Sequence, residues 1–241
     1  MNIPIAKTVL YYMKKKTFIL LFISTLITVS QSYAQMLKRP TKKVYLSTDF
    51  DIFLLSSSIK EQVGSKKLTT PRFSAIPFLG LNANYDFSKN VRLYAGFNIK
   101  NIGFIEKFSN PDSTVKRRVY TIGAPIGLKI GDIKYGSYII VGIGADFPFH
   151  YKEKGYTKRN DKTKYSEWFS DRTPRIMTYA FVGVHLMPVL TFKAQYYPTN
   201  FLNQDYKVTD ASGKQSRPYY DYYVPTIMLT AGIDIPFSPK D

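Results

Sequence analysis

From residue 44 to residue 237 the chain repeats one pattern, in which apolar side chains occupy every second position for roughly ten residues at a time. In the last repeat Ile227, Leu229 and Ile233 share one phase, whereas Thr230 and Asp234 share the other. Alternation with period two predicts a β-strand whose two faces meet different environments. The pattern predicts eight strands, at about residues 44–55, 73–87, 91–105, 120–130, 139–147, 175–186, 190–197 and 225–237.

The segments between the expected strands alternate in length. Those at 86–90, 131–134 and 186–189 are short, and those at 56–72, 106–118, 151–174 and 200–217 are long and polar. Outer-membrane barrels have short periplasmic turns and longer outer loops. The sequence therefore predicts an all-β fold: an eight-stranded antiparallel up-and-down transmembrane β-barrel with short periplasmic turns and long extracellular loops.

The first 34 residues have the three parts of a signal peptide. Lys14, Lys15 and Lys16 precede the apolar run Thr17–Val29, and Ser32-Tyr33-Ala34 supplies small residues for cleavage before Gln35. Met13 is the alternative initiator. We expect a signal peptide at 1–34, a short periplasmic segment at 35–42, the barrel at 43–237 and a tail at 238–241. The chain has no cysteine, so neither a lipid anchor nor a disulfide framework is expected.

The two phases of the strands differ in charge. The apolar phase carries no charged residue near the strand centres, where an Arg or Lys facing lipid would cost roughly 2–4 kcal/mol. We expect the polar phase to face a closed lumen, because an eight-stranded barrel is filled by its own side chains. Buried charges must be paired there. The residues predicted to form lumen charge pairs are Asp49, Asp51, Asp146 and Asp234 with Arg92, Lys100, Lys129 and Lys193.

The chain is strongly basic, with a formal net charge of +17. Four of these charges are lysines of the first 34 residues, which leaves +13. Export and the position of the basic residues outside the strand centres argue against a nucleic acid partner and favour a solvated cationic rim. Basic and aromatic residues alternate in the third long connection, which suggests binding to lipopolysaccharide phosphates or to an extracellular polyanion. The candidate loop residues are Lys158, Arg159, Lys162, Lys164 and Trp168.

Three segments carry a resemblance to a known family: Ala124–Lys129, Tyr138–Gly144 and Tyr196–Phe201. Together with the signal end, they resemble the porin-like or PorT-like outer-membrane β-barrel family of Bacteroidota. The resemblance implies a barrel, with neither a catalytic residue nor an open pore. The terminal residues Thr230, Gly232, Ile235 and Phe237 resemble a signal read by the barrel-insertion machinery. An aliphatic residue at 235 and four residues after Phe237 depart from that signal.

Two other classes of protein stay open at this point. A small outer-membrane enzyme of acyltransferase or protease type would need a catalytic histidine, and His150, close to Asp146 on the lumen phase, is the candidate. A soluble lipocalin-like carrier would turn its apolar phase inward. Neither a phosphate-binding loop nor a zinc spacing nor a nucleophile elbow occurs, so we expect no catalytic residue, no metal and no cofactor.

Overall fold

The computed structural model describes residues 43–237, apart from 63–64, 75–77, 110–111, 134, 158–161 and 187–189, and apart from the side chains of residues 52, 53 and 60–67. The expected signal peptide, periplasmic segment and tail lie outside this range. Within it, no helix is long and apolar enough to cross a membrane.

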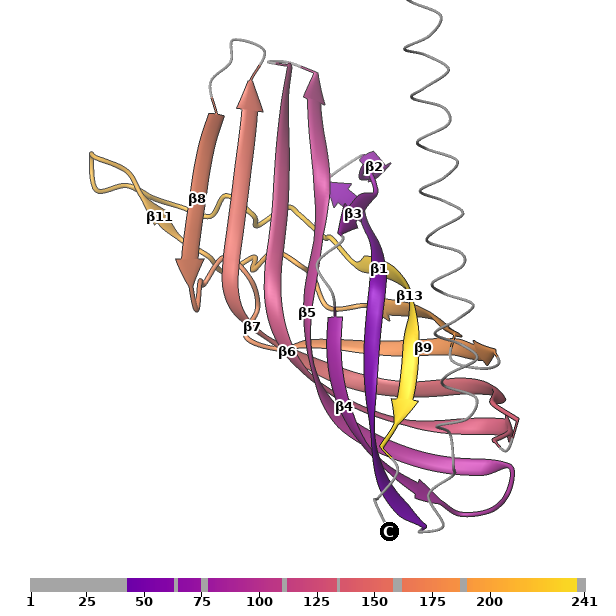
Figure 1. Ribbon diagram of the computed structural model, residues 1–241. Helices are drawn as coiled ribbons and strands as arrows, with labels where there is room; N and C mark the ends of the chain where they lie inside the picture. Colours follow the sequence, from indigo (N-terminus) through magenta and orange to yellow (C-terminus); the bar gives the residue numbers. More distant parts are fainter. Residues whose placement is uncertain are drawn as a thin grey trace, which may run out of the picture. The chain divides into compact units, whose positions relative to one another are not determined.

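Eight antiparallel strands pair in a ring (Figure 1). Their order is β13-β10-β9-β7-β6-β5-β4-β1, and β1 pairs with β13 to close it. The ring strands are β1 (Val44–Gln62), β4 (Phe78–Asp86), β5 (Val91–Ser109), β6 (Asp112–Asp132), β7 (Ser137–Thr157), β9 (Met177–Leu186), β10 (Leu190–Tyr197) and β13 (Thr226–Pro236). The predicted eight-stranded antiparallel barrel is thus confirmed, because strands that are neighbours in sequence are also neighbours in the ring.

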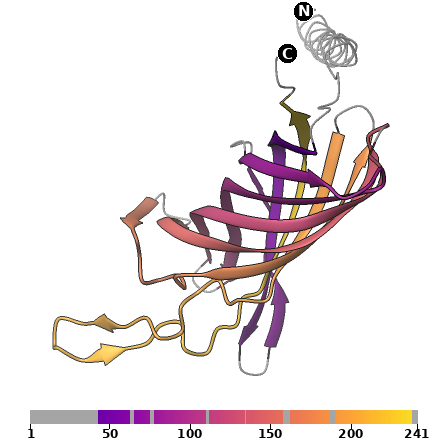
Figure 2. The ribbon, with the colours of Figure 1, turned by 90° about the horizontal axis from the view of Figure 1, so that it is seen from below.

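Five shorter strands lie in the connections at the opposite end from the short turns. They are β2 (Ser65–Leu68), β3 (Arg72–Ser74), β8 (Lys162–Trp168), β11 (Val208–Thr209) and β12 (Gln215–Ser216). β3 pairs with β1, and β8 pairs with β7. β11 and β12 form a separate hairpin that projects from the barrel wall (Figure 2).

The apolar phase of the strands points outward. Leu79, Phe97 and Ile143 are 52%, 70% and 62% exposed, while the intervening polar residues are buried. In β9 and β10 the alternation runs without interruption through His185 and Thr191, both of which are buried. The side chains that alternate with the exposed set therefore fill the inside of the ring.

Two of the predicted long connections, 106–118 and 151–174, consist largely of strand. β5 continues to Ser109 and β6 begins at Asp112, while β7 continues to Thr157 and is followed by β8. The upper parts of β5, β6 and β7, with β8, form an extension of the barrel wall (Figure 1). Its strands carry charged residues on the outward face in place of apolar ones, which is why the hydrophobic pattern ended below them.

Two β-bulges reverse the predicted facing of residues in the upper wall. The pairing of β1 with β13 shifts between Asp51 and Phe53, so that Leu54 is buried, although simple alternation from the exposed Leu46 predicts that it faces outward. The pairing of β6 with β7 shifts so that Thr121 pairs with Pro148 and Tyr120 with His150, which leaves Phe149 as the extra residue. A bulge changes the phase of every residue beyond it.

Candidate functional sites

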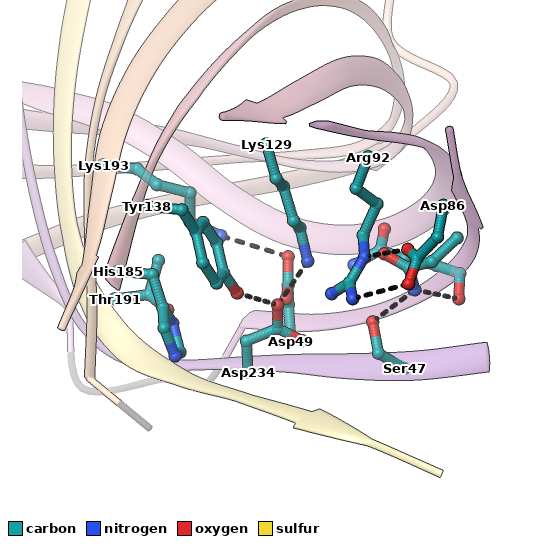
Figure 3. Close-up of polar contacts among 12 residues, drawn as sticks. Ser47, Asp49, Asp86, Arg92, Lys129, Tyr138, His185, Thr191, Lys193 and Asp234 are labelled. Atoms are coloured by element: carbon teal, nitrogen blue, oxygen red, sulfur yellow. Dashed lines mark hydrogen bonds and ion pairs between the residues drawn. The ribbon is translucent and has the colours of Figure 1, made fainter. Parts of the chain in front are cut away.

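The lower lumen is held by a network of acids and lysines from opposite walls (Figure 3). Asp49 and Asp234 lie directly opposite each other on β1 and β13, where two like charges would repel. Lys129 of β6 pairs with Asp234, and Tyr138 donates a hydrogen bond of 3.1 Å to the same carboxylate. Lys129 and Tyr138 thus connect β6 and β7 to β13 across the lumen.

Lys193 of β10 serves two acids at once. Its Nζ lies 3.3 Å from a carboxylate oxygen of Asp49 and 3.2 Å from one of Asp51. Lys129 pairs with Asp234 and Lys193 pairs with Asp49, so each lysine compensates the negative charge of an acid on another strand.

A second layer lies higher in the lumen around Lys100 and Asp146. Their side chains are fully buried, and Nζ of Lys100 is 2.9 Å from the Asp146 carboxylate. Tyr197 donates a 2.8 Å hydrogen bond to the same oxygen of Asp146, Oδ2, that Lys100 contacts. Lys100 also donates to Oε1 of Gln195 at 3.1 Å and stands 3.7 Å from the ring centroid of Tyr179. The pair is therefore surrounded by polar and aromatic partners.

Arg92 is the one predicted lumen residue that the structure places apart from the others. It pairs with Asp86, six residues earlier and directly opposite it on β4, near a short turn (Figure 3). Sequence reasoning missed Asp86 because it ends a strand and was counted with the turn. The other seven predicted residues belong to the two layers described above.

Aromatic side chains and one long connection fill most of the remaining lumen. A cavity of about 20 Å³ beside Asp49 and Lys193 is large enough for about one water molecule. At the end of the barrel that carries the long connections, Phe201 of the connection between β10 and β13 is fully buried against Phe104, with ring centroids 5.1 Å apart. The connection thus turns into the barrel, although its β11–β12 hairpin points away.

The inner face of the wall extension holds a further charge cluster that sequence reasoning missed. Arg117 of β6 contacts both Glu106 of β5 and Glu153 of β7. Tyr151 donates to Glu153 at 2.7 Å. On β8, hydrogen bonds from Ser170 and then Tyr165 hold the pKa of Glu167 below its ordinary value. Glu106, Glu153 and Glu167 are therefore already engaged by partners within the extension.

The outer face of the extension begins with a row of rings just above the apolar wall. The imidazole of His150 lies between Trp168, with centroids 4.2 Å apart, and Tyr120, with centroids 5.7 Å apart. Phe169 follows Trp168 with a φ of 50° and is 77% exposed, a conformation that is costly for a bulky residue. These rings form an aromatic band on the outside of the barrel.

The prediction that His150 lies on the lumen phase near Asp146 is wrong. The bulge at Phe149 turns His150 outward, whereas Asp146 is bound to Lys100 and Tyr197. His150 Nε2 is 2.8 Å from Oγ of Ser166, but among the described residues no carboxylate hydrogen-bonds to His150. A serine–histidine nucleophile requires such an orienting acid. Within the same residues, no cluster of His, Cys, Asp or Glu is suited to a metal ion.

Above the aromatic band the outer face is basic, and we call the following residues the cationic outer face: Lys116, Arg118, Lys152, Lys154, Lys162 and Lys164. Tyr120 lies 5.7 Å from the Arg118 guanidinium and 5.4 Å from Nζ of Lys152. Tyr156 stands 5.3 Å from Nζ of Lys116. Cation–π contacts of this kind orient basic side chains but do not neutralise their positive charge.

The remaining predicted site residues divide between the wall and segments outside the described residues. Lys162, Lys164 and Trp168 are exposed on β8, whereas Lys158 and Arg159 lie outside the described residues. Of the predicted assembly signal, Thr230 and Gly232 face the lumen, Ile235 is half-buried and Phe237 is 48% exposed. Phe237 extends the edge of the wall, because its backbone N–H donates to the carbonyl of Leu46 at 2.8 Å.

No protein-family model and no curated protein matches the chain. Among solved structures, Ail of Yersinia pestis, in complex with the heparin analogue sucrose octasulfate, is 17% identical, covers 79% of this chain and 99% of its own, and has a TM-score of 0.33. Neisserial surface protein A is 11% identical over 81% and 98%, with a TM-score of 0.38. The N-terminal β-barrel domain of Pseudomonas aeruginosa OprF is 10% identical over 78% and 97%, with a TM-score of 0.30. At these low identities and TM-scores, the assignment of the barrel rests on the strand pairing itself.

Proposed function

We propose that the chain is an outer-membrane β-barrel protein that has a closed, charge-paired lumen and works by binding at its outer surface. The observation that carries this proposal is the direction of the two phases: apolar side chains cover the outside of a closed ring, and lysine–aspartate pairs fill its inside. Soluble monomers rarely expose a continuous apolar surface of such extent. Hydrocarbon around the barrel accounts for it.

The same observation argues against a lipocalin-like carrier. A carrier of that type turns apolar residues into a cavity and charged residues outward. Here Lys100 and Asp146 are fully buried within the ring, whereas Phe97 on the adjoining outward position is 70% exposed. The polarity of the wall is the reverse of what a carrier for apolar ligands needs.

The closed lumen is supported by packing and by charge. Lysines from β5, β6 and β10 reach acids on other strands and so cross the space through which ions would move. Phe201 occupies the outer mouth against Phe104. A conducting porin needs a water-filled channel, which the larger barrels supply.

The role we propose is structural and binding, not catalytic. Among the described residues, no acid orients His150 as a hydrolytic nucleophile would need, and its ring is held in a stack of aromatic side chains. The extension formed by β5–β8 provides a rigid platform outside the barrel for surface binding or envelope organisation. The PorT-like family assignment and the reading of the last strand by the insertion machinery stay predictions from the sequence.

Location and orientation are tested together by labelling single-cysteine variants, since the natural chain has no cysteine. Lys164→Cys lies on the exposed β8, and Lys89→Cys lies in the exposed short turn before β5. In intact Gram-negative cells, a membrane-impermeant maleimide should label the first variant and reach the second only after the envelope is opened. Recovery of the folded chain in the aqueous phase without detergent would overturn the proposal.

A further inference from the structure

The cationic outer face is arranged in rows across three paired strands. Lys116 of β6 lies opposite Lys154 of β7, which lies opposite Lys164 of β8. In the next row toward the barrel, Arg118 lies opposite Lys152. Side chains directly opposite on antiparallel strands have Cβ atoms about 4.5–5.5 Å apart, and like charges there destabilise the sheet. Such rows require a counter-charge.

The chain does not supply that counter-charge from the residues that the structure describes. Within those residues, no carboxylate lies at ion-pair distance from any cation of the face. Among the acids of the extension, Glu106 and Glu153 point to the opposite side of the sheet and hold Arg117, whereas Asp112 shares the phase of the cations but stands at the start of β6, four residues from Lys116. Burial and then the positive charges of Lys152 and Arg118 lower the pKa of His150, as expected beside an uncompensated basic cluster.

A buried guanidinium adjoins the same rows. Arg72 of β3 is 8% exposed, and its Nη1 has no hydrogen-bond partner among the described residues. Burial and then the charge of Arg118 lower the pKa of Arg72 to about 10. A buried, unpartnered donor of a charged group is unfavourable unless an acceptor reaches it. An anion beside Arg118 would meet this need.

The height of the rows on the barrel identifies the source of the anion. Ile122 of β6 and Phe147 of β7 are exposed on the lipid-facing phase, and Tyr120, His150 and Trp168 form the next level above them. At about 3.3 Å per residue, Arg118 lies roughly 13 Å beyond Ile122 along the strand. Aromatic side chains favour the membrane interface, and lipid headgroups begin at that level. The cations therefore face sideways into the headgroup layer.

We propose that the cationic outer face binds the phosphate groups of a phosphorylated glycolipid of the outer leaflet, such as the lipid A part of lipopolysaccharide. Arg118 suits bidentate contacts to phosphate oxygens, and the lysines supply further positive charge. The inference deepens the proposed function and rests on it, because the face meets lipid headgroups only in a barrel that sits in an outer membrane. An extracellular polyanion is the competing occupant.

Trp168 provides a direct probe, since it is the only tryptophan of the chain and lies in the aromatic band below the cations. We would place the full chain in zwitterionic detergent micelles and titrate bisphosphorylated lipid A while recording Trp168 fluorescence. The test variant is R118Q/K152Q/K154Q, and the charge-matched control is K89Q/K207Q/K214Q, on exposed residues outside the cationic outer face. We expect at least a tenfold loss of affinity in the test variant and no loss in the control.

Three outcomes would overturn the inference: equal affinity of the test variant and the natural chain, equal affinity for lipid A lacking both phosphates, and binding of soluble heparin to the face without binding of lipid A. Folding of each variant is checked by heat-modifiable migration in gels, and the single variants R118Q and K154Q replace the triple one if it does not fold. Insertion into vesicles of phosphatidylcholine alone is measured separately. If the chain inserts into vesicles but binds lipid A equally well with and without phosphates, only this inference is contradicted. If the chain never inserts, the proposed function is contradicted.

Discussion

Substitution of Lys100 by Met tests whether the charge pairs of the lumen stabilise the barrel. The change removes a fully buried ammonium group that lies 2.9 Å from the equally buried carboxylate of Asp146. Asp146 would keep only the 2.8 Å hydrogen bond from Tyr197. Methionine is close to lysine in length and is apolar, so the variant changes charge more than volume.

Removing one partner of a buried pair costs about 3–5 kcal/mol, because the other charge stays buried without compensation. The full cost is expected here, since solvent reaches neither side chain. A free energy of about 1.4 kcal/mol corresponds to a factor of ten, so the equilibrium ratio of folded to unfolded chains should fall by at least about two powers of ten. The double variant K100M/D146N removes both charges and retains a polar group for Tyr197, so it should recover most of the loss.

The measurement is reversible unfolding in denaturant from lipid vesicles, followed by circular dichroism and heat-modifiable migration. Lys207→Met, on an exposed residue outside the lumen and the cationic outer face, is the matched control and should change the free energy of unfolding by less than about 0.5 kcal/mol. The reasoning is refuted if K100M unfolds within about 1 kcal/mol of the natural chain. It is also refuted if the double variant is as unstable as the single one.

Three further predictions follow from the closure, the bulge and the lumen. Gly232→Val should abolish the heat-modifiable form, because a Cβ at this position would lie 2.3 Å from the carbonyl oxygen of Phe50 across the closing β1–β13 pair. The control Ala231→Val, on the outward face, should fold normally. Normal folding of the Gly232 variant would contradict this view of how the barrel closes. Deletion of Phe149 removes the extra residue of the bulge and keeps His150 opposite Tyr120 and Lys152 opposite Arg118, so a cysteine at position 152 should react with maleimide both with and without Phe149; protection of that cysteine in the deletion variant would count against Phe149 as the bulged residue. In planar bilayers the chain should show no large stable conductance steps, and their appearance would disprove the closed lumen.

The strand pattern and the set of charged residues that face the lumen could be predicted from the sequence, because both depend on local alternation along the chain. Whether a side chain points to one face of a strand or the other depends only on its neighbours along the chain, so Phe97 and Lys100 could be assigned to opposite faces before any pairing was known. Leu54 and His150 were assigned wrongly, because each follows a bulge that the alternation does not reveal. The outer extension was missed because its exposed face is charged and its strands therefore lack the apolar period.

The sequence by itself determined that eight strands with one apolar face each follow one another, and that the acids and bases of the other face must be buried together. Only the tertiary structure decided which acid pairs with which base. Lys100 pairs with Asp146, Lys129 pairs with Asp234, and Arg92 pairs with Asp86, away from the other lumen charges. The tertiary structure also decided that Lys116, Lys154 and Lys164 form one row. The physical reason is that facing is a property of a single strand, whereas contacts across the lumen and along a row depend on the order, register and bulges of strands far apart in the chain.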